Sequence, residues 1–338
     1  MDASKAHNAR VNRDRGAMSL VKLIEQFADE DRSRAYLEGL RWPDGVRCPN
    51  CGFDRISRIQ TATRYRRDTK DGKHKKGEVR GKREQFDCLS CGYQFSVKSG
   101  TVFHDSHLPL WKWFLATYLM CESKKGMSAN QLKRTLEVSY GTAWYLCHRI
   151  RWAMKEATVE LLSGIVEADE TYVGGKRRGI GHQRALDNKT MVLGAIQRDG
   201  RIRLRATKRG TQATTRVLHS FLRDVVAETA TAIYTDQHKG YKGIADANTR
   251  HETVDHSAEE WVRGDVGTQN VESAWSLLKR SIIGSYHQLS AKHLPAYLDE
   301  FSFRFNNREN PYLFRDTLLA LIKADALSYE ELTATQHE

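Results

Sequence analysis

No apolar run in this sequence of 338 residues approaches the roughly 20 residues that an α-helix needs to cross a membrane. This absence excludes a membrane protein of the helical type. The first 17 residues are polar and basic, and no apolar segment follows them, so we expect no signal peptide and a cytoplasmic location. Apolar residues are not scarce overall, because 40% of the chain is hydrophobic, which is enough for folded cores. The length allows two or three domains.

Acidic residues are the scarcer of the two charged classes. The chain has 42 Asp and Glu against 54 Lys and Arg, which gives a net charge of +12 and a pI of about 9.4. Such an excess attracts polyanions over a long range, so we expect a nucleic acid as partner. We interpret residues 1–17 as a basic disordered arm, which either touches DNA or is a solvated tail.

Cysteine is also scarce, and four of the six cysteines stand in two close pairs. The pairs are CPNCG, with Cys48 and Cys51, and CLSCG, with Cys88 and Cys91. This spacing predicts a zinc ribbon, in which four thiolates close a tetrahedral site and the glycine after each pair permits a tight turn. Since four thiolates leave no open coordination position, the predicted zinc ion is structural. The alternatives are a redox pair and a chance pairing.

A strongly basic segment, residues 61–85, lies between the two cysteine pairs and holds ten Lys or Arg against four acids. We interpret it as an extended β-hairpin arm with its tip near the KDGK and KKGE stretches. Its function would be to contact DNA, and the alternative is a merely solvated hairpin. The cations predicted to contact DNA are Arg64, Arg66, Arg67, Lys73, Lys75, Lys76, Arg80, Lys82 and Arg83.

Helical periodicity flanks the ribbon on both sides. Residues 20–40 predict a helix that packs beside the ribbon, and residues 108–120 predict an aromatic core helix. The two remaining cysteines, Cys121 and Cys147, lie in helical patterns, so we expect them to be buried core residues rather than metal ligands.

Residues 128–154 show a helix, a short turn and a second helix, which is the pattern of a helix-turn-helix. Ser128 is placed to cap the first helix, and the second is predicted to begin near Gly141. Thr142, Tyr145 and Arg149 share a face that points away from the apolar stripe, so we predict that they read DNA. Helix pairs are common, and a purely structural pair is the alternative.

After residue 162 the pattern changes to strands. Residues 165–171, 190–197 and 201–207 read as strands, residues 211–228 as a helix, and the next strand ends at Asp236. Three antiparallel strands, a helix and a strand that ends in an acid are the order of a ribonuclease-H-like α/β fold. The first and fourth strands are neighbours in that fold, so Asp169 and Asp236 can share metal ions.

The first of these strands carries three acids, Glu167, Asp169 and Glu170, which we expect to be exposed at the strand end. Carboxylates are the ligands that a divalent metal ion prefers. The loop that follows is rich in Gly and Arg, and a basic loop attracts an anion, most often phosphate. The sequence therefore predicts metal-dependent chemistry on a nucleic acid.

A third ligand is expected from the helical stretch GTQNVESAWSLLKRSIIG. With 100° per residue, Val271, Ala274, Leu278 and Ile282 form a buried stripe. Glu272 and Lys279 project together about 90° away from that stripe and about 10 Å from each other. Asn270 lies about 160° round from Glu272. Thr268 and Asn270 are both suited to cap this helix, and we prefer Glu272 as ligand and Asn270 as the cap.

Six segments together resemble the DDE transposases of bacterial insertion sequences, in the group numbered fifteen-ninety-five, whose members also carry an N-terminal zinc ribbon. The segments are RWPDGVRCPNCG, GTAWYLCHRIRWAM, VEADETYVGG, YTDQHKGY, NVESAWSLLKR and YLDEFSFRFNNR, and the resemblance covers about residues 18–312. It implies that Asp169, Asp236 and Glu272 are the metal-binding triad. Many relatives have Asn at or near the third position, which keeps Asn270 as a rival.

The resemblance also implies DNA contacts near this triad, by Lys279 and Arg280 and by the loop cations Lys176, Arg177 and Arg178. The triad would hold two magnesium ions, which manganese can replace. One ion activates water or the DNA 3′-hydroxyl, and the other stabilises the leaving oxygen. No Ser or Tyr constellation suggests a covalent intermediate. Because an element has two ends, at least a dimer is expected on double-stranded DNA, both terminal inverted repeats and target.

The expected domain plan has six parts: a basic arm (1–17), a helical segment (18–45), a zinc ribbon with its hairpin arm (46–104), a helix-turn-helix (105–158), a ribonuclease-H-like catalytic domain (162–312), and a C-terminal helix and tail (313–338). The expected function is DNA cleavage at element ends and joining to a target. The alternatives are a zinc-ribbon regulator, a domesticated relative without strand transfer, and a structure-specific nuclease.

Overall fold

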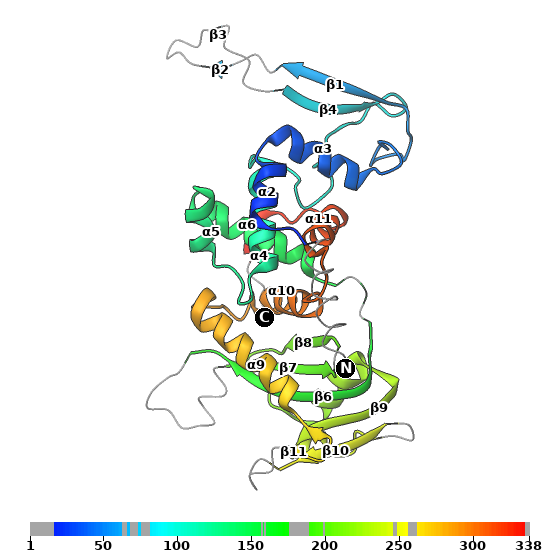
Figure 1. The fold of residues 1–338 in the computed structure, drawn as a ribbon, viewed down its shortest axis with the longest axis vertical. Coiled ribbons are helices and arrows are strands. Elements are labelled where there is room, and N and C mark those ends of the chain that lie inside the picture. Colours follow the sequence, from blue (N-terminus) through cyan, green and yellow to red (C-terminus); the bar gives the residue numbers. More distant parts are fainter. Residues whose placement is uncertain are drawn as a thin grey trace, which may run out of the picture. The chain divides into compact units, whose positions relative to one another are not determined.

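The computed structural model describes residues 17–62, 66–67, 74–75, 82–156, 158, 160–175, 189–198, 200–245, 249–255 and 262–334. These residues form two compact units (Figure 1). The N-terminal unit consists of residues 18–115 and 315–328, and the sheet unit contains residues 116–314 and the chain from 329 onward. In the described part of the chain, no helix is both long enough and apolar enough to cross a membrane.

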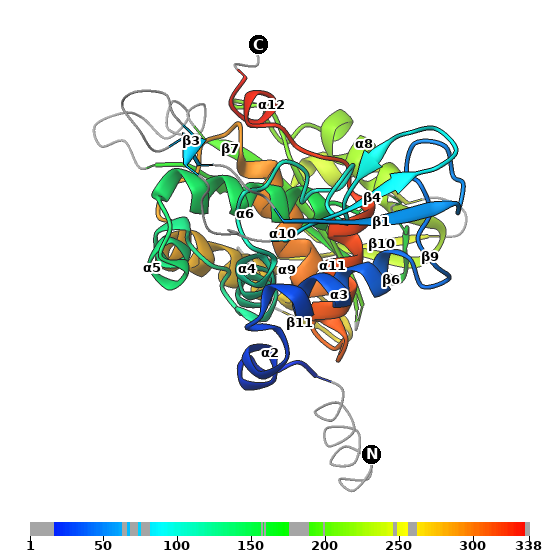
Figure 2. The ribbon, with the colours of Figure 1, turned by 90° about the horizontal axis from the view of Figure 1, so that it is seen from above.

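Residues 20–40 form two helices instead of the single helix that the periodicity predicts. These are α2 (Leu20–Phe27) and α3 (Glu30–Arg41), which Figure 2 shows in dark blue. The break occurs at Asp29, whose carboxylate accepts hydrogen bonds from the backbone N–H groups of Asp31 and Arg32 at 2.6 and 3.1 Å. An aspartate in this position caps a new helix and ends the continuity of the previous one.

The ribbon consists of β1 (Ile56–Ala62), β4 (Lys82–Cys88) and β5 (Gln94–Phe95) in one antiparallel sheet of order β1-β4-β5. The pairing of β1 with β4 forms the base of the predicted hairpin, and further out β2 (Arg66–Arg67) pairs with β3 (His74–Lys75). As predicted, α3 packs beside the ribbon, since Arg58 of β1 contacts Glu38 of α3 at 2.5 Å.

Two short helices, α5 (Ala129–Leu136) and α6 (Tyr140–Met154), follow α4 (Leu110–Glu122) and form the predicted helix pair. Ser128 caps α5 as predicted, by accepting the N–H of Gln131 at 3.1 Å. Ser139 caps α6 in the same way, through the N–H of Thr142. The chain turns between the helices at Glu137, whose φ is 52°. The pair is present, and its reading of DNA stays a prediction.

The sheet unit is built on five strands in the order β10-β9-β6-β7-β8. The strands are β6 (Leu162–Val173), β7 (Thr190–Gln197), β8 (Ile202–Ala206), β9 (Val226–Asp236) and β10 (Arg250–Val254). The first three are antiparallel, while β9 runs parallel to β6 and β10 runs parallel to β9. The prediction that the first and fourth strands are neighbours is therefore confirmed. Two short strands, β11 (Val262–Arg263) and β12 (Val266–Gly267), form a separate hairpin.

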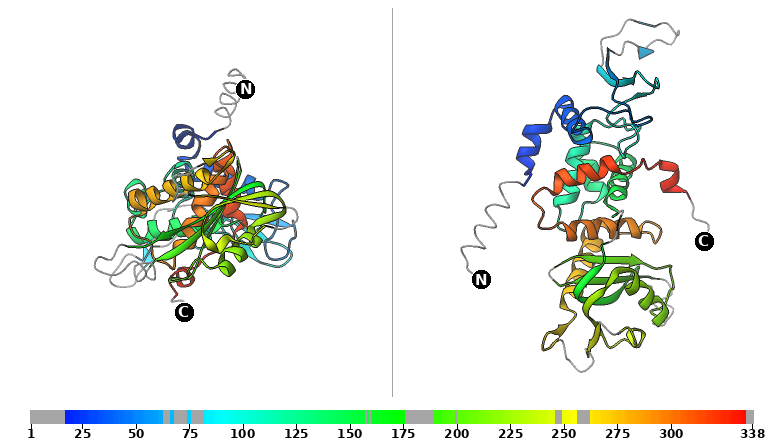
Figure 3. Two further views of the ribbon diagram at one scale, coloured as in Figure 1. Left: turned by 90° about the horizontal axis from the view of Figure 1, so that it is seen from below. Right: turned by 90° about the vertical axis from the view of Figure 1, so that its right-hand side faces the viewer.

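Helices cover both faces of this sheet, as Figure 3 shows on its left. On one face α8 (Thr215–Val225) packs Leu218, Phe221 and Leu222 onto Val166 and Ala168. On the other face lie α9 (Gln269–Ser281) and α10 (Leu294–Asn306). The predicted stripe of α9 is confirmed, because Val271, Ala274 and Leu278 are buried there. Since alternate residues of a strand point to opposite faces, Glu167 and Asp169 face α9.

The C-terminal part of the sheet unit closes this second face. A π-helical turn (Ile282–Tyr286) directly follows α9, and a short loop then leads to α10. Asn306, at the end of α10, accepts a hydrogen bond from the N–H of Ile202 at 2.8 Å and donates one to its carbonyl at 3.3 Å. The FNNREN stretch (residues 305–310) thus begins by fastening the end of α10 to β8. The chain continues through α11 (Leu313–Lys323) to α12 (Tyr329–Thr333).

Candidate active site and zinc centre

The four paired cysteines meet in the ribbon, as predicted. The Sγ atoms of Cys48, Cys51, Cys88 and Cys91 all lie within 4.8 Å of one another. The Cys48–Cys91 distance is 3.7 Å and the Cys51–Cys88 distance is 3.5 Å. Zn–S bonds of about 2.3 Å in a tetrahedron place sulfurs about 3.8 Å apart, so the cluster fits a zinc ion.

The local backbone explains how the two knuckles form. Gly52 and Gly92 follow the pairs with φ of +76° and +69°, a conformation that glycine adopts without strain. The N–H of each glycine returns to the carbonyl of the first cysteine of its pair, at 2.9 and 2.8 Å. By contrast, Cys121 and Cys147 are buried away from this cluster, which confirms their prediction as core residues.

The first two predicted acids lie side by side at the carboxyl end of the central strands. In the parallel register of β6 and β9, Glu167 pairs with Tyr234, so two residues further on Asp169 lies beside Asp236 on the same face. Burial, reinforced by the charges of Glu170 and Asp236, raises the pKa of Asp169 to about 7. Crowded, half-buried carboxylates are stabilised by a cation, which makes this pair suited to a divalent metal ion.

Trp275 of α9 completes the wall of this site, and its role was not predicted. Its indole Nε1 donates a hydrogen bond to Asp169 Oδ2 at 2.9 Å, and the side chain is only 4% exposed. Gly194 of β7 pairs with Asp169 and makes room for the ring, because a Cβ there would lie 2.5 Å from it. A glycine inside a strand often marks the close approach of another group, so the Gly194 of GAIQ is the one feature of the sequence that could have indicated this contact.

Glu167 has a different role from the one its position suggested. It is fully buried, so the prediction that it is exposed is wrong. Its carboxylate accepts hydrogen bonds from the N–H groups of Asn270 and Val271 at 2.8 and 3.3 Å. It also accepts one from Asn270 Nδ2 at 2.7 Å and pairs with Arg198 at 3.1 Å. Glu167 thus caps α9 from outside the helix, where a negative charge meets unpaired N–H groups.

This arrangement corrects the predicted cap of α9. The N-cap position belongs to Thr268, and Asn270 lies inside the first turn. The cap was misplaced because an isolated sequence does not show that a buried carboxylate from another strand satisfies the helix N-terminus. The amide nitrogen of Asn270 points to Glu167, which sets this residue apart from Glu272.

Glu272, the preferred third ligand, is half-buried on α9, and its carboxylate accepts a hydrogen bond from Thr268 Oγ1 at 2.8 Å. In the described part of the chain, the cysteines form the one group of three or more candidate ligands whose ligand atoms lie together. The structure therefore does not bring Glu272 into one cluster with Asp169 and Asp236. Lys279 is exposed about two turns further along the flank of Glu272, as the helical spacing predicts.

Glu170 lies on the opposite face of β6, towards α8. It accepts a hydrogen bond from the hydroxyl of Tyr241 at 2.8 Å, and burial raises its pKa. Asp236 in turn accepts the N–H of His238 at 3.0 Å, which fixes the turn after β9. Tyr241 and its turn were not predicted, because nothing in the local sequence shows that the turn folds back over the first strand.

Apart from Lys279 and Arg280 on α9, the residues predicted to contact DNA fall into three groups. On α6, Thr142 is exposed and Tyr145 half-buried, whereas Arg149 is 4% exposed and its guanidinium lies 5.2 Å from the Tyr145 ring. The prediction that Arg149 faces solvent is therefore wrong, because its side chain is buried and lies against the Tyr145 ring. On the hairpin, Arg66, Arg67, Lys75, Lys82 and Arg83 lie in paired strands. Outside the described residues lie Arg64, Lys73, Lys76, Arg80, Lys176, Arg177 and Arg178.

Comparisons with known families match both parts of the chain. A family model described as an ISXO2-like transposase domain matches residues 161–306, and one described as a transposase zinc-ribbon domain matches residues 28–94. The chain is also 30% identical over 298 residues to a protein of Halobacterium salinarum described as an uncharacterized protein in transposable element ISH50. That alignment covers 83% of this chain and 92% of the other protein.

Two solved structures show a weaker similarity. One is the simian T-cell lymphotropic virus intasome in complex with PP2A regulatory subunit B56 gamma, with 12% identity, coverage of 67% of this chain and 76% of that chain, and a TM-score of 0.25. The other is the Mos1 strand transfer complex, with 13% identity, coverage of 62% and 74%, and a TM-score of 0.28.

Proposed function

We propose that this chain, which belongs to the ISXO2-like family of insertion-sequence transposases, cuts DNA at the ends of its element and joins the freed 3′-hydroxyl to a target. The single observation that carries this proposal is the side-by-side position of Asp169 and Asp236 on neighbouring strands, under Trp275. Members of this family move DNA, which requires strand cleavage, and two neighbouring, half-buried carboxylates are suited to hold the metal ions for that reaction. Acting on the chromosome or a plasmid, the enzyme would work in the bacterial cytoplasm.

Asp169 and Asp236 would hold two magnesium ions, with Glu272 as third ligand. When bound, the metal activates the attacking water or 3′-hydroxyl and stabilises the leaving oxygen. Burial, and after it the charges of Glu170 and Asp236, raise the pKa of Asp169, and a bound cation would favour its ionised form, which supports this assignment. One oxygen of the Glu272 carboxylate accepts the hydroxyl of Thr268, and the other would be its metal ligand.

The other residues of the site position these acids. The Trp275 indole donates to one oxygen of Asp169 and fixes the orientation of this carboxylate. Glu167 anchors the first turn of α9, and with it the direction in which Glu272 projects. Lys279 would contact a DNA phosphate next to the cleaved bond, since it is exposed on the flank of Glu272.

The zinc ribbon, its hairpin arm and the exposed residues of α6 would bind the terminal inverted repeats. The four cysteines would hold one structural zinc ion, which keeps the base of the arm folded. Since two element ends have to be processed together, the active complex would be a dimer or larger on double-stranded DNA.

The direct test incubates the purified protein with labelled element ends, a plasmid target and magnesium. We expect a free 3′-hydroxyl at each element end and a product in which the end is joined to the plasmid. Cleavage without joining would identify a nuclease, and binding without cleavage would identify a regulator. Either result would contradict the proposed function.

A further inference from the structure

A groove runs along α9 on the flank that faces away from Glu272 and Lys279. Asn270, Ser273, Leu277 and Arg280 recur there at spacings of three and four residues, which places them on one side of the helix. Two adjoining cavities, of about 350 and about 250 Å³, lie against this flank. They share four lining residues, Lys124, Leu277, Phe305 and Arg308, so they form one continuous groove, the α9 groove.

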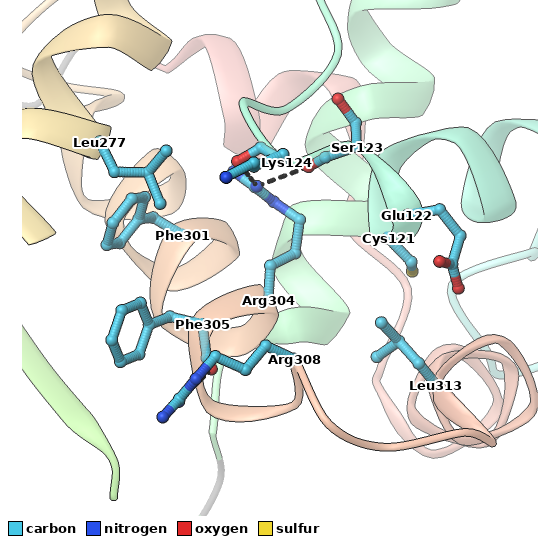
Figure 4. A pocket seen from close by; sticks show the side chains of 10 residues that line it. All are labelled: Cys121, Glu122, Ser123, Lys124, Leu277, Phe301, Arg304, Phe305, Arg308 and Leu313. Carbon is cyan, nitrogen blue, oxygen red and sulfur yellow. Dashed lines mark hydrogen bonds between the residues drawn. The ribbon is translucent and has the colours of Figure 1, made fainter. Parts of the chain in front are cut away.

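The walls of the α9 groove are both aromatic and cationic. Figure 4 shows Phe301 and Phe305 together on one side of the larger cavity, with Leu277 next to them. The guanidinium of Arg308 lies 4.5 Å from the Phe305 ring centre and is held by the carbonyls of Gly200 and Phe305 at 3.2 and 2.9 Å. A fixed cation above an aromatic ring is a platform on which a sugar or a base can lie.

Three exposed cations line the groove: Lys124, Arg280 and Arg308. None of them pairs with an acid in the described part of the chain. Arg304, which lines the same cavity, differs from these three cations. It is buried, pairs with Glu300 and donates to the carbonyls of Ser123 and Lys124, so its role is structural. The three groove cations thus carry charge that the fold leaves uncompensated.

Acidic character is almost absent from the α9 groove. Glu122 is its one acidic lining residue among the described residues, and burial raises the pKa of this carboxyl. In Figure 4 it lies beside Cys121 and Leu313, across the cavity from Phe305 and Arg308. The charge of the groove therefore favours an anion along the α9 side.

We propose that the α9 groove binds the sugar–phosphate backbone of one DNA strand, with Lys124, Arg280 and Arg308 on its phosphates and Phe305 against a sugar or an unstacked base. The inference rests on the proposed function, which supplies DNA as the polyanion. The groove begins at Asn270, whose side chain is held by Glu167, two residues before Asp169. A strand that leaves the acid pair can pass the start of α9 and continue along its second flank.

The test compares two triple variants of the full-length protein. The first, Lys124→Gln with Arg280→Gln and Arg308→Gln, removes the groove cations. The control, Lys208→Gln with Arg216→Gln and Arg223→Gln, removes three exposed cations on and near α8, on the other face of the sheet. Binding to an element-end duplex is measured by fluorescence anisotropy without divalent metal, over a range of salt concentrations.

We expect the groove variant to flatten the slope of log affinity against log salt by about 2–3, since each lost phosphate contact removes about 0.9. Its affinity at 0.1 M salt is expected to fall on the order of tenfold or more. The charge-preserving variant, Lys124→Arg with Arg280→Lys and Arg308→Lys, should keep the wild-type slope. If the triple glutamine variant fails to fold, each single glutamine variant should lower the slope by about 0.9.

The outcomes separate this inference from the proposed function. If the wild type binds and cleaves element ends while the groove variant and the control have the same slope, the groove proposal is overturned and the transposase proposal stands. If the wild type neither binds nor cleaves these ends, the proposed function fails and the groove proposal falls with it.

Discussion

Asn270 and Glu272 stand two residues apart on α9, yet their side chains have different partners. The amide nitrogen of Asn270 donates to the buried carboxylate of Glu167. Glu272 is held by the hydroxyl of Thr268, which is a contact that a metal ion can replace. A carboxylate also brings charge to a divalent ion, whereas an amide does not. These contacts favour Glu272 as third ligand.

The substitution Glu272→Gln is expected to reduce cleavage of element ends by about 100-fold or more, because even residues that only support a metal ligand cost 10–100-fold. DNA binding should survive, since the shape of the side chain is kept. Asn270→Ser is the matched control, and it should retain most cleavage because its hydroxyl can still donate to Glu167. Cleavage by Glu272→Gln together with inactivity of Asn270→Ser would show that the third ligand is Asn270.

Asp299 on α10 gives a prediction about pH. Burial raises its pKa to about 6, from an ordinary 3.8. A carboxyl with a raised folded-state pKa binds its proton more tightly when folded, so the free energy of unfolding falls as pH rises from about 4 to about 6. Asp299→Asn should therefore stabilise the protein by about 1–3 kcal/mol at pH 8 and by little at pH 4. Urea unfolding at both pH values checks this, and an equal effect at both would contradict it.

Single residues also show where prediction from sequence ends. Asp169 and Asp236 were predictable as a pair because strand alternation and strand order determine which side chains are neighbours. Glu167 and Trp275 were not, because their roles depend on how α9 crosses the sheet. That crossing is set by packing of buried side chains from distant segments, and no local pattern records it.

Among the helices and strands, α9 is held in place on the sheet by contacts to its first turn. The periodic apolar stripe predicts which face of α9 is buried, but not which residue of another strand meets its first turn. Glu167 meets it with three hydrogen bonds and adds an ion pair to Arg198. The break between α2 and α3 has the same kind of cause, since a single capping aspartate, Asp29, outweighs a continuous helical period.

The substitution Glu167→Gln tests this anchoring of α9. It places an amide against N–H donors in a buried site, so we expect a loss of about 3 kcal/mol in the free energy of unfolding. The control is Glu160→Gln, whose side chain is 67% exposed and pairs with Arg201, and which should cost less than about 1 kcal/mol. Equal unfolding curves for the two variants in urea would contradict the role of Glu167.

In the whole molecule, we expect the zinc ribbon of the N-terminal unit to need its metal ion for folding, whereas the sheet unit should fold without one. The ribbon core consists of little more than Phe86, Phe95 and two of the cysteines, whereas the sheet has apolar clusters on both faces. Removing zinc with a strong chelator should therefore unfold the ribbon and leave the sheet unit folded. Protease protection of the two units measures this difference.

Metal analysis provides the matched comparison for the zinc prediction. Cys88→Ser should lose the bound zinc ion, because three thiolates and a hydroxyl make a much weaker site. Cys147→Ser, which changes a buried core thiol, should keep one zinc ion per chain. Folded wild-type protein without zinc would end the zinc-ribbon interpretation.

The hairpin arm and the α9 groove belong to different units, and both are proposed to contribute to the affinity for the same DNA. Neutralising Arg64, Arg66, Arg67, Lys75 and Lys76 should flatten the salt dependence of binding by about 4–5, at about 0.9 per lost phosphate contact. If arm and groove bind the same duplex through separate contacts, their effects should add when the two sets of substitutions are combined. If the arm variant keeps the wild-type slope of log affinity against log salt, the hairpin does not contact DNA and is only a solvated hairpin. A combined effect no larger than that of the arm alone would mean that the groove cations do not contact the bound DNA.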